Sequence, residues 1–285
     1  VRSRPPRQWI HCDRTLQFVD DGLKGVQKKS IPCRMRILHI TPSIGQESYG
    51  LGSVVGGLAN AQNDLGMSVS IWCLDQESEL EWAAANYHLP GKCIKSYNVV
   101  GPRHLGLSVG MINAMKKQGG QFDVLHQHGI WTGISNATNT WRKKFAKPTD
   151  IAPHGSLEPW ALKRSPFKKW LALTLYESSN LNAVSALHAT SDKEINNFRR
   201  FGLKRPVAFI PNGISRKWSD SVGVAARFHQ HCGIEEGQRI LLYMGRITPQ
   251  KGIPLLLDAI RENRDSFTGW TLVIVGNDEF GHQAQ

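Results

Sequence analysis

The feature that most constrains the fold of this chain is a regular alternation of short apolar segments with longer amphipathic ones. Residues 36–41 have the length and apolar character of a buried strand, and a glycine-containing loop follows them. Residues 53–65 carry apolar side chains at helical spacing, and residues 69–74 form the next expected strand. A strand, a helix and a second strand in this order are typical of the start of a doubly wound parallel sheet.

The same alternation continues downstream. Further strands are expected at residues 93–100, 123–127, 150–153, 187–190 and 207–210. Helices are expected at residues 107–117, 135–145, 166–180 and 192–201. The pattern then begins again, with a helix expected at residues 252–261 between strands at residues 239–244 and 271–275. We therefore predict an α/β architecture of two Rossmann-like doubly wound domains.

The boundary between these domains is predicted at the turn formed by Pro211, Asn212 and Gly213. Residues 35–213 then form the first domain and residues 214–285 the second. A doubly wound domain has about five or six strands, and only two are expected in the second domain. We therefore expect the second domain to be incomplete.

The N-terminal segment, residues 1–34, is basic and lacks the apolar core of a signal peptide. Met35 directly precedes the first expected strand. We expect the segment to be either a disordered basic arm or an extension in front of a natural start at Met35.

The formal net charge of +12 narrows the classes of partner to nucleic acid, an anionic membrane surface and anionic small molecules. The basic residues are spread along the chain without a combined basic and aromatic nucleic-acid motif, which favours lipid or phosphorylated substrates. The five cysteines are odd in number and form no Cys-x-x-Cys pair. We therefore expect free thiols in a reducing compartment such as the cytoplasm.

Residues 245–252 follow a strand and lead into a helix. Arg246 is expected at the carboxyl end of the strand, where α/β folds bind ligands. Lys251 is expected at the start of the helix, where the backbone N–H groups and the helix dipole favour anions. Such a pair can neutralise the diphosphate of a leaving nucleotide. The alternative is two solvated surface charges.

Gly50 and Gly52 follow the first strand and open a helix, as in part of a dinucleotide-binding fingerprint. The third glycine of that fingerprint is missing, and no acidic residue follows the second strand in the strict nicotinamide pattern, although Asp75 is near. These glycines also suit the close approach of another ligand to the backbone.

His126, His128 and Trp131 lie at or just past the carboxyl end of the strand that begins at Asp123, which is expected to end at Leu125 or Gln127, so we expect their side chains to face a cleft. The two histidines offer metal ligands, but no third ligand stands out by spacing. Contacts with an acceptor or a phosphate are the functional interpretation. The alternative for His126 is a core histidine with satisfied hydrogen bonds.

The segment at residues 153–160 again follows a short strand. Its His154 can hydrogen-bond a sugar hydroxyl or a developing charge. Trp160 can stack on a sugar face, and Glu158 can accept hydrogen bonds from hydroxyl groups. The alternative is a rigid loop bounded by prolines, without chemistry.

Basic and aromatic residues interleave over residues 160–170. Such a stretch can rest on an anionic membrane. The alternative is a helix that buries Phe167 and Leu171 and leaves its lysines in solvent.

Taken together and in this order, the motifs resemble the retaining family 4 glycosyltransferases, also called glycosyl transferases group 1. The resemblance runs from Met35 to the C-terminus. It rests on the segments at residues 35–43, 50–54, 123–129, 153–160, 187–191, 210–214, 243–247 and 251–252.

The resemblance implies two domains that face a cleft in the GT-B arrangement, the first binding the acceptor and the second the donor. It implies that Arg246 and Lys251 hold the donor diphosphate, with Gly50 and Gly52 approaching the same phosphates. His154 is then the catalytic residue near the transferred sugar. The acceptor residues are then His126, His128, Trp131, Glu158 and Trp160.

The implied activity is transfer of a sugar from a nucleotide sugar to a hydroxyl of a carbohydrate or lipid-linked acceptor, with retained anomeric configuration. It implies no metal and no cofactor beyond the nucleotide sugar as co-substrate. The setting is cell-surface polysaccharide or glycolipid assembly in the cytoplasm, at the inner face of the plasma membrane.

The family also carries a later Glu-x7-Glu motif, and the sequence ends before that motif is reached; Glu279 does not replace it by position. The alternative function is therefore a non-catalytic remnant that retains only the acceptor-binding domain. The sequence leaves open the donor nucleotide and sugar, the identity of the acceptor and the oligomeric state.

Overall fold

The computed structural model describes residues 35–214, 223, 225–235, 237–248 and 251–277. The chain divides into two compact units, residues 1–215 and residues 216–285. The predicted N-terminal extension, residues 1–34, lies outside the described residues. Among the residues that are described, no helix has both the length and the apolar character needed to cross a bilayer.

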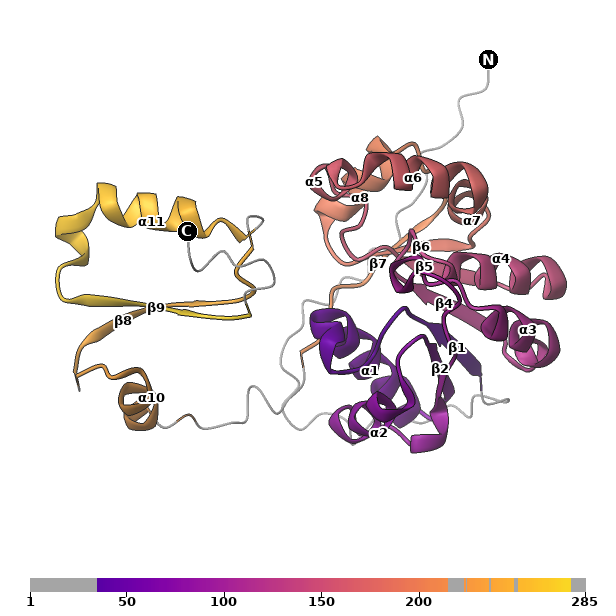
Figure 1. Cartoon of the computed structure of the whole chain (residues 1–285), viewed down its shortest axis with the longest axis horizontal. Coiled ribbons are helices and arrows are strands. Elements are labelled where there is room, and N and C mark those ends of the chain that lie inside the picture. Colours follow the sequence, from indigo (N-terminus) through magenta and orange to yellow (C-terminus); the bar gives the residue numbers. More distant parts are fainter. Residues whose placement is uncertain (1–34, 215–222, 224, 236, 249–250, 278–285) are drawn as a thin grey trace, which may run out of the picture. The chain divides into compact units, whose positions relative to one another are not determined.

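Unit 1, residues 1–215, is built on a seven-stranded parallel sheet with the strand order β3-β2-β1-β4-β5-β6-β7 (Figure 1). The strands are β1 (Arg36–Ile40), β2 (Ser68–Cys73), β3 (Ile94–Ser96), β4 (Val124–His128), β5 (Thr149–Ala152), β6 (Ala186–Ala189) and β7 (Val207–Phe209). The order reverses between β1 and β4. This reversal is the switch point of a doubly wound fold, and ligands bind outside the carboxyl ends of the strands there.

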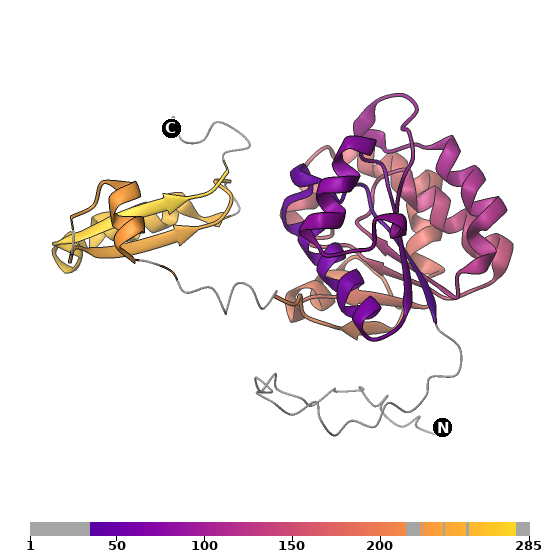
Figure 2. The same cartoon turned by 90° about the horizontal axis from the view of Figure 1, so that it is seen from below.

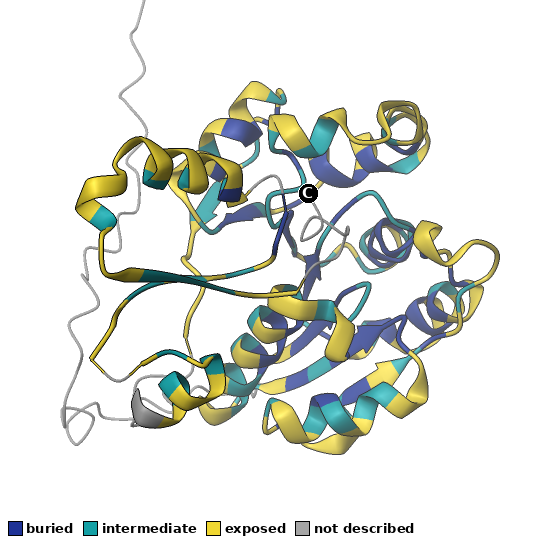
Figure 3. Ribbon diagram, turned by 60° about the vertical axis from the view of Figure 1, so that its left-hand side comes forward, coloured by how far each residue is buried: buried dark blue, intermediate teal, exposed yellow. Residues whose placement is uncertain are grey.

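The helices of unit 1 cover both faces of the sheet (Figures 1 and 2). They are α1 (Tyr49–Asp64), α2 (Glu77–Asn86), α3 (Val109–Gln118), α4 (Ile134–Phe145), α5 (Pro159–Lys163), α6 (Pro166–Ala172), α7 (Ser178–Asn182) and α8 (Asp192–Arg200). Alternate side chains of β2 show the two faces. Trp72 packs in one core with residues of α3 and α4, whereas Ile71 packs in another with residues of α1 and α2. The central strands are therefore buried on both faces (Figure 3).

Unit 2, residues 216–285, contains a two-stranded parallel sheet formed by β8 (Arg239–Met244) and β9 (Trp270–Val275). The helices described in this unit are α10 (Ala225–Cys232) and α11 (Ile253–Glu262). The register pairs Arg239 with Trp270 and Met244 with Val275. Much of this unit is exposed in Figure 3.

The predicted α/β class with parallel sheets is confirmed, whereas several element boundaries differ from those predicted. Helix α1 begins at Tyr49 rather than at residue 53, and α2 was not predicted. The helix predicted at residues 166–180 is a series in which a π-helical turn, Leu173–Glu177, separates α6 from α7. The arrangement of the two units around a cleft stays a prediction.

Candidate functional site

Five histidines gather at the carboxyl end of the sheet in unit 1. His39 lies on β1, His126 and His128 on β4, and His188 on β6, whereas His154 follows β5. The pairing of β1 with β4 sets His39 beside His126. The parallel register thus brings together residues that are far apart in the sequence, because the carboxyl ends of all strands meet at one edge.

Three of these rings and one glutamine form a continuous hydrogen-bonded series. Nδ1 of His39 lies 2.9 Å from Nε2 of His128. Nδ1 of His128 lies 3.0 Å from Nε2 of His154, and the two rings stack with an interplanar angle of 13°. At the other end, Nε2 of His39 lies 2.7 Å from Oε1 of Gln62 on α1. We call these four residues the histidine series.

His126 belongs to a separate branch. Its Nε2 lies 3.3 Å from Nδ1 of His188, and Nε2 of His188 lies 2.8 Å from the backbone oxygen of Ile210. The ring centroids of His126 and His128 are only 4.1 Å apart. The two branches therefore touch through ring packing rather than through a described hydrogen bond.

Burial favours the neutral form of four of these histidines, His39, His126, His128 and His154. Desolvation lowers the pKa of His39 to about 4, although its hydrogen bond to Gln62 opposes the shift. Desolvation and the neighbouring rings lower the pKa of His126 and of His128 well below the ordinary value. Desolvation also lowers the pKa of His154 to about 4, against the opposing charge of Glu194. The rings thus act near neutral pH as hydrogen-bonding groups without charge.

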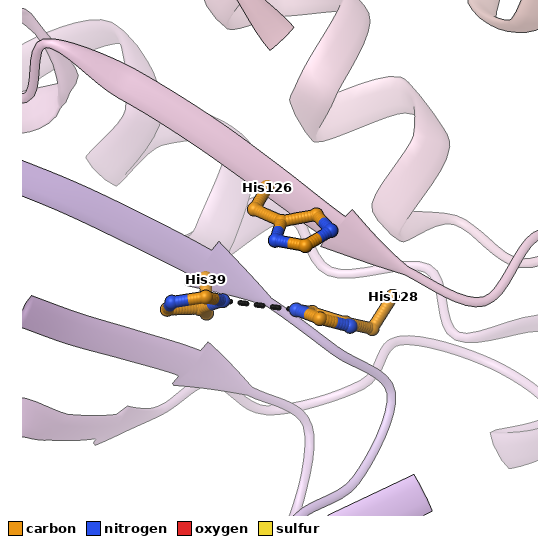
Figure 4. Close-up of side chains that lie close together, drawn as sticks. All are labelled: His39, His126 and His128. Carbon is orange, nitrogen blue, oxygen red and sulfur yellow. Dashed lines mark hydrogen bonds between the residues drawn. The ribbon is translucent and has the colours of Figure 1, made fainter. Parts of the chain in front are cut away.

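His39, His126 and His128 also form a group that could hold a metal ion, with one ligand nitrogen from each ring and all within 4.8 Å of one another (Figure 4). The expectation that no third ligand accompanies the two histidines of β4 is therefore wrong, because β1 supplies His39. However, the nitrogens of His39 and His128 that face each other are hydrogen-bonded, so one of them carries a proton. The absence of a metal from the reaction stays a prediction.

The sequence prediction for β4 needs a second correction. The strand continues to His128 instead of ending at Leu125 or Gln127, and both of its histidines are buried, at 8% and 0% exposure. They therefore support the site from inside unit 1 and do not face a cleft. Their direct contact with an acceptor stays a prediction.

His154 lies in a loop that the fold constrains strongly. Its backbone has a positive φ of 50°, and Gly155 follows with a φ of 77°. The N–H of Gly155 donates to Oε1 of the buried Glu194 at 2.6 Å, and both the N–H and the hydroxyl of Thr190 donate to Oε2 at 2.8 Å. A non-glycine residue with positive φ is uncommon and strained. Glu194 therefore helps to hold the loop in this conformation.

A second buried carboxylate, Glu177, holds the loop that carries Trp131. It accepts hydrogen bonds from the N–H of Trp131 at 2.9 Å, the hydroxyl of Ser135 at 2.8 Å and the side-chain amide of Asn180 at 3.0 Å. Desolvation raises the pKa of Glu177, and the same hydrogen bonds oppose the shift. The carboxylate replaces its lost water with these three donors.

The predicted acceptor residues Trp131 and Trp160 line one surface pocket of about 280 Å³. Its other lining residues are Ser156, Ala161, Arg164, Ser165 and Lys169. The indole N–H of Trp131 donates to the backbone oxygen of Ser156 at 3.2 Å. Glu158 is not among the lining residues and forms an ion pair with Lys193 at 2.8 Å. The structure thus joins the two tryptophans in one hollow and leaves Glu158 beside it.

Gly50 and Gly52 lie in the first turn of α1 and not in the preceding loop. They differ in what surrounds them. A Cβ on Gly52 would lie 1.9 Å from Oγ of Ser48, so packing requires this glycine, whereas a Cβ on Gly50 would meet nothing within 4 Å. Asp75 fixes the approach to this helix by accepting from the backbone N–H of Ile44 at 2.6 Å. The first turn of α1 therefore offers backbone donors where a phosphate can bind.

In unit 2, Arg246 is exposed and follows β8, and Lys251 is exposed and precedes α11. The backbone oxygen of Arg246 accepts a hydrogen bond from the hydroxyl of Tyr243 at 3.1 Å. Gly252, with a φ of 69°, makes the turn into α11. Arg246 therefore lies just past the carboxyl end of β8 and Lys251 just before α11, in the positions predicted from the motif.

Several residues of the site were not predicted, namely His39, His188, Gln62, Glu177 and Glu194. His39 and His188 lie in otherwise apolar strand segments. A histidine inside such a segment indicates a buried polar group, and this feature could have identified both residues as members of the site. Gln62, Glu177 and Glu194 lie on helices and resemble ordinary polar surface positions in the sequence. Only tertiary packing shows that they turn inward.

Comparison with models of known protein families identifies the family of the chain. Residues 49–218 match the family model described as Glycosyltransferase Family 4, and residues 225–285 match the model described as Glycosyl transferases group 1. The chain belongs to this family of glycosyltransferases. A comparison with curated proteins finds no match.

Solved structures resemble this chain at low sequence identity. HepE from Anabaena, in complex with UDP-glucose, matches with a TM-score of 0.61 and 16% identity, over 88% of this chain and 63% of that chain. Sucrose-phosphate synthase from Thermosynechococcus elongatus matches with a TM-score of 0.60 and 16% identity, over 85% of this chain and 62% of that chain. UDP-GlcNAc 2-epimerase from Neisseria meningitidis, bound to UDP-GlcNAc, matches with a TM-score of 0.54 and 14% identity, over 84% of this chain and 65% of that chain.

These likenesses confirm the predicted GT-B fold class. The chain spans less than two thirds of the length of each of the three structures. Since a sucrose-phosphate synthase and a UDP-GlcNAc 2-epimerase share the fold, the fold by itself does not define the reaction.

Proposed function

We propose that the full-length protein transfers a sugar from a nucleotide-sugar donor to a hydroxyl acceptor with retained anomeric configuration, in the assembly of a cell-surface polysaccharide or glycolipid. The observation that carries the proposal is the strained His154 loop at the switch-point edge of a glycosyltransferase domain. The complex of HepE with UDP-glucose supports a nucleotide-sugar donor.

The donor diphosphate is assigned to cationic and backbone donors. Arg246 offers a planar guanidinium and Lys251 an ammonium group, and both are exposed. The first turn of α1, with Gly50 and Gly52, offers backbone N–H groups. Charge neutralisation by these groups stabilises the leaving nucleoside diphosphate without a metal.

The reaction breaks the bond between the anomeric carbon and the diphosphate oxygen and forms a bond from the acceptor oxygen to the same carbon. The leaving phosphate takes the proton of the acceptor hydroxyl, through an oxocarbenium-like state. His154 lies next to the transferred sugar as the catalytic residue. The pocket of Trp131 and Trp160 receives the acceptor, because tryptophan faces stack well on the apolar faces of sugars.

The surface of α6 and of the π-helical turn that follows it, Leu173–Glu177, supports peripheral contact with an anionic membrane. Phe167, Trp170 and Leu175 are 72%, 59% and 68% exposed, and the rings of Phe167 and Trp170 stack on each other. Lysines flank these residues in the sequence. Exposed aromatic and basic side chains together are typical of interfacial helices. Co-sedimentation with anionic vesicles at low salt tests this contact, and an absence of binding would remove it.

The central test is a transfer assay on the full-length protein with a panel of nucleotide sugars. We expect Arg246→Ala and Lys251→Ala each to lower kcat/KM by about 100-fold or more, because each removes charge stabilisation of the leaving group. Arg264→Ala is the matched control, since Arg264 is an exposed cation of the same unit outside the motif.

Correctly folded protein that neither transfers nor hydrolyses any donor would contradict the proposal. Binding of an acceptor without turnover would instead support the alternative of a non-catalytic remnant. Equal decreases of kcat/KM in Arg246→Ala and Arg264→Ala would contradict the assignment of the diphosphate site.

A further inference from the structure

The histidine series has one direction of proton donation. A neutral imidazole has one N–H donor and one lone-pair acceptor, so a hydrogen-bonded series of neutral rings is ordered from one end. Oε1 of Gln62 can only accept, and it lies 2.7 Å from Nε2 of His39. His39 therefore carries its proton on Nε2 and presents a lone pair at Nδ1.

The next two bonds follow from this first one. Nε2 of His128 must donate to Nδ1 of His39 across 2.9 Å, which leaves the lone pair of His128 at Nδ1. Nε2 of His154 must then donate to that atom across 3.0 Å. His154 is thereby protonated on Nε2, and its lone pair lies on Nδ1.

The neighbouring branch does not disturb this order. The backbone oxygen of Ile210 accepts from Nε2 of His188, and in the tautomer with its single proton on Nε2 the Nδ1 of His188 accepts from Nε2 of His126. His126 therefore packs against His128 while its own donor is directed elsewhere. The direction of the histidine series is thus set at Gln62.

Nδ1 of His154 is available as an acceptor. Within the described residues no hydrogen bond reaches this atom, and the ring is only half-buried, unlike those of His39 and His128. The positive φ of His154 and the contact of Gly155 with Glu194 hold the loop in place. The fold therefore fixes both the position of the ring and the nitrogen that carries the lone pair.

We propose that Gln62, acting through His39 and His128, holds His154 in the tautomer protonated on Nε2, so that Nδ1 accepts a hydrogen bond from a substrate hydroxyl. Gln62 is a positioning residue in this scheme. The role of His154 toward substrate rests on the proposed function, whereas its tautomer does not depend on substrate.

Nitrogen-15 NMR of the imidazole rings in the full chain tests the tautomer directly. Long-range proton–nitrogen correlations distinguish the two neutral tautomers, and His154→Asn assigns the signals of that ring by difference. We expect wild-type His154 to be protonated on Nε2. Protonation on Nδ1 in the wild-type protein would overturn the proposal, even if no variant could be purified.

Three variants test the control exerted by Gln62. Gln62→Met removes the acceptor at nearly constant side-chain length, so His154 should become a mixture of tautomers. Gln62→Glu keeps an acceptor and should restore the wild-type tautomer. Asn63→Met is the matched control, because Asn63 is the next residue of α1 and equally half-buried. An unchanged tautomer in Gln62→Met would overturn the proposal.

Steady-state kinetics of the full-length protein tests the substrate contact. We expect Gln62→Met to lower kcat by about two- to ten-fold, the effect of losing one hydrogen bond, with the donor KM unchanged. Gln62→Glu should recover kcat, and Asn63→Met should not alter it. Unchanged kcat in Gln62→Met together with a changed tautomer would overturn the hydroxyl contact.

Two further outcomes separate this inference from its alternatives. Added Zn²⁺ that shifts the ring signals of His39, His126 and His128 together would show a metal in place of the hydrogen bond, and would overturn the proposal. In the second outcome, NMR shows the expected tautomer in the wild type and its loss in Gln62→Met, while the assay shows no transfer from any nucleotide sugar. That combination would support the positioning role of Gln62 and would contradict the proposed function.

Discussion

The two units use similar strands in different surroundings. In unit 1, Leu38 and Ile40 of β1 are fully buried, because β2 and β4 flank the strand and helices cover both faces. In unit 2, Leu242 and Met244 of β8 are 49% and 73% exposed, and the sheet described there has two strands. An apolar run in a sequence thus identifies a strand, whereas its neighbours decide how much of it is buried.

The largest expected difference between the units is in the free energy of unfolding that is lost when one tryptophan in each unit is replaced by alanine. Trp141 is fully buried, and its indole N–H donates to the backbone oxygen of Gly119 at 2.7 Å. Trp141→Ala should lower the free energy of unfolding of unit 1 by about 3–5 kcal/mol through a cavity and a lost hydrogen bond. Trp270, which is 38% exposed on β9, should lose about 1 kcal/mol or less when changed to alanine.

Urea denaturation of both variants, followed by circular dichroism, measures this difference. Similar losses in the two variants would show that the strands of unit 2 are more completely packed than their exposure indicates.

For one glycine-to-alanine substitution in each unit, we expect the more exposed unit 2 to lose stability and unit 1 to gain it. A Cβ on Gly276, just after β9, would lie 1.7 Å from the backbone oxygen of Gly245. Gly276→Ala should therefore destabilise unit 2 by about 1–3 kcal/mol, since backbone must move. A Cβ on Gly57 in α1 would meet nothing within 4 Å, so Gly57→Ala should stabilise unit 1 by about 0.5–1 kcal/mol.

Thermal unfolding of the two glycine variants provides the check. A neutral Gly276→Ala would mean that the ends of β8 and β9 separate without cost.

Hydrogen exchange compares the local stability of the strands in the two units without mutation. Backbone amides of β8 and β9 should exchange about ten-fold faster or more than those of β1 and β4, because a two-stranded sheet is only marginally stable. Exchange mass spectrometry of the full chain compares the four strands in one sample. Equal protection would indicate that the two units unfold together.

The smallest expected effect concerns one ion pair in each unit. Arg36 donates from its guanidinium and its backbone N–H to Asp123 at 2.7–3.1 Å, and these contacts lower the pKa of Asp123 to about 2. Since the folded pKa lies below the ordinary 3.8, the stabilisation is present above about pH 4 and is lost as the pH falls toward 2. Asp123→Asn should lose about 0.5–1 kcal/mol at neutral pH, and this loss should fade as the pH falls through about 2.

The matched variant in unit 2 is Asp258→Asn. Its partner Arg261 is 78% exposed, and Asp258 is 54% exposed. The loss should be below about 0.5 kcal/mol, as for other exposed helix pairs. Urea titrations at neutral pH and near pH 2 separate the two variants, and a pH-independent loss in Asp123→Asn would contradict the ion-pair explanation.

The fold was predictable to a large extent from local pattern, and the departures have physical causes. The helix expected to begin at residue 53 starts at Tyr49, because Gly50 and Gly52 were interpreted as loop residues although both fit a helical turn. Helix α2 was missed because its sequence, Glu77–Asn86, lacks a clear apolar face. Strand β4 was expected to end at Leu125 or Gln127, whereas it continues to His128 and both of its histidines are buried.

The candidate site was predictable only in part. His154, Arg246 and Lys251 were identified because each follows a strand or precedes a helix, and chain order alone reveals such positions. Gln62 and His39 were not, since a helical glutamine and a strand histidine have ordinary neighbours in the sequence.

The sequence by itself determined the order of strands and helices, the family and the cationic motif of unit 2, because periodicity and short motifs are local properties. Only the tertiary structure decided that Gln62, His39, His128 and His154 meet. They meet because parallel strands from distant parts of the chain bring their carboxyl ends to one edge, and the register of β1 against β4 selects which side chains touch. Burial at that edge keeps the rings neutral, so each ring has one donor and one acceptor nitrogen, and the contact with Gln62 sets the direction of the series.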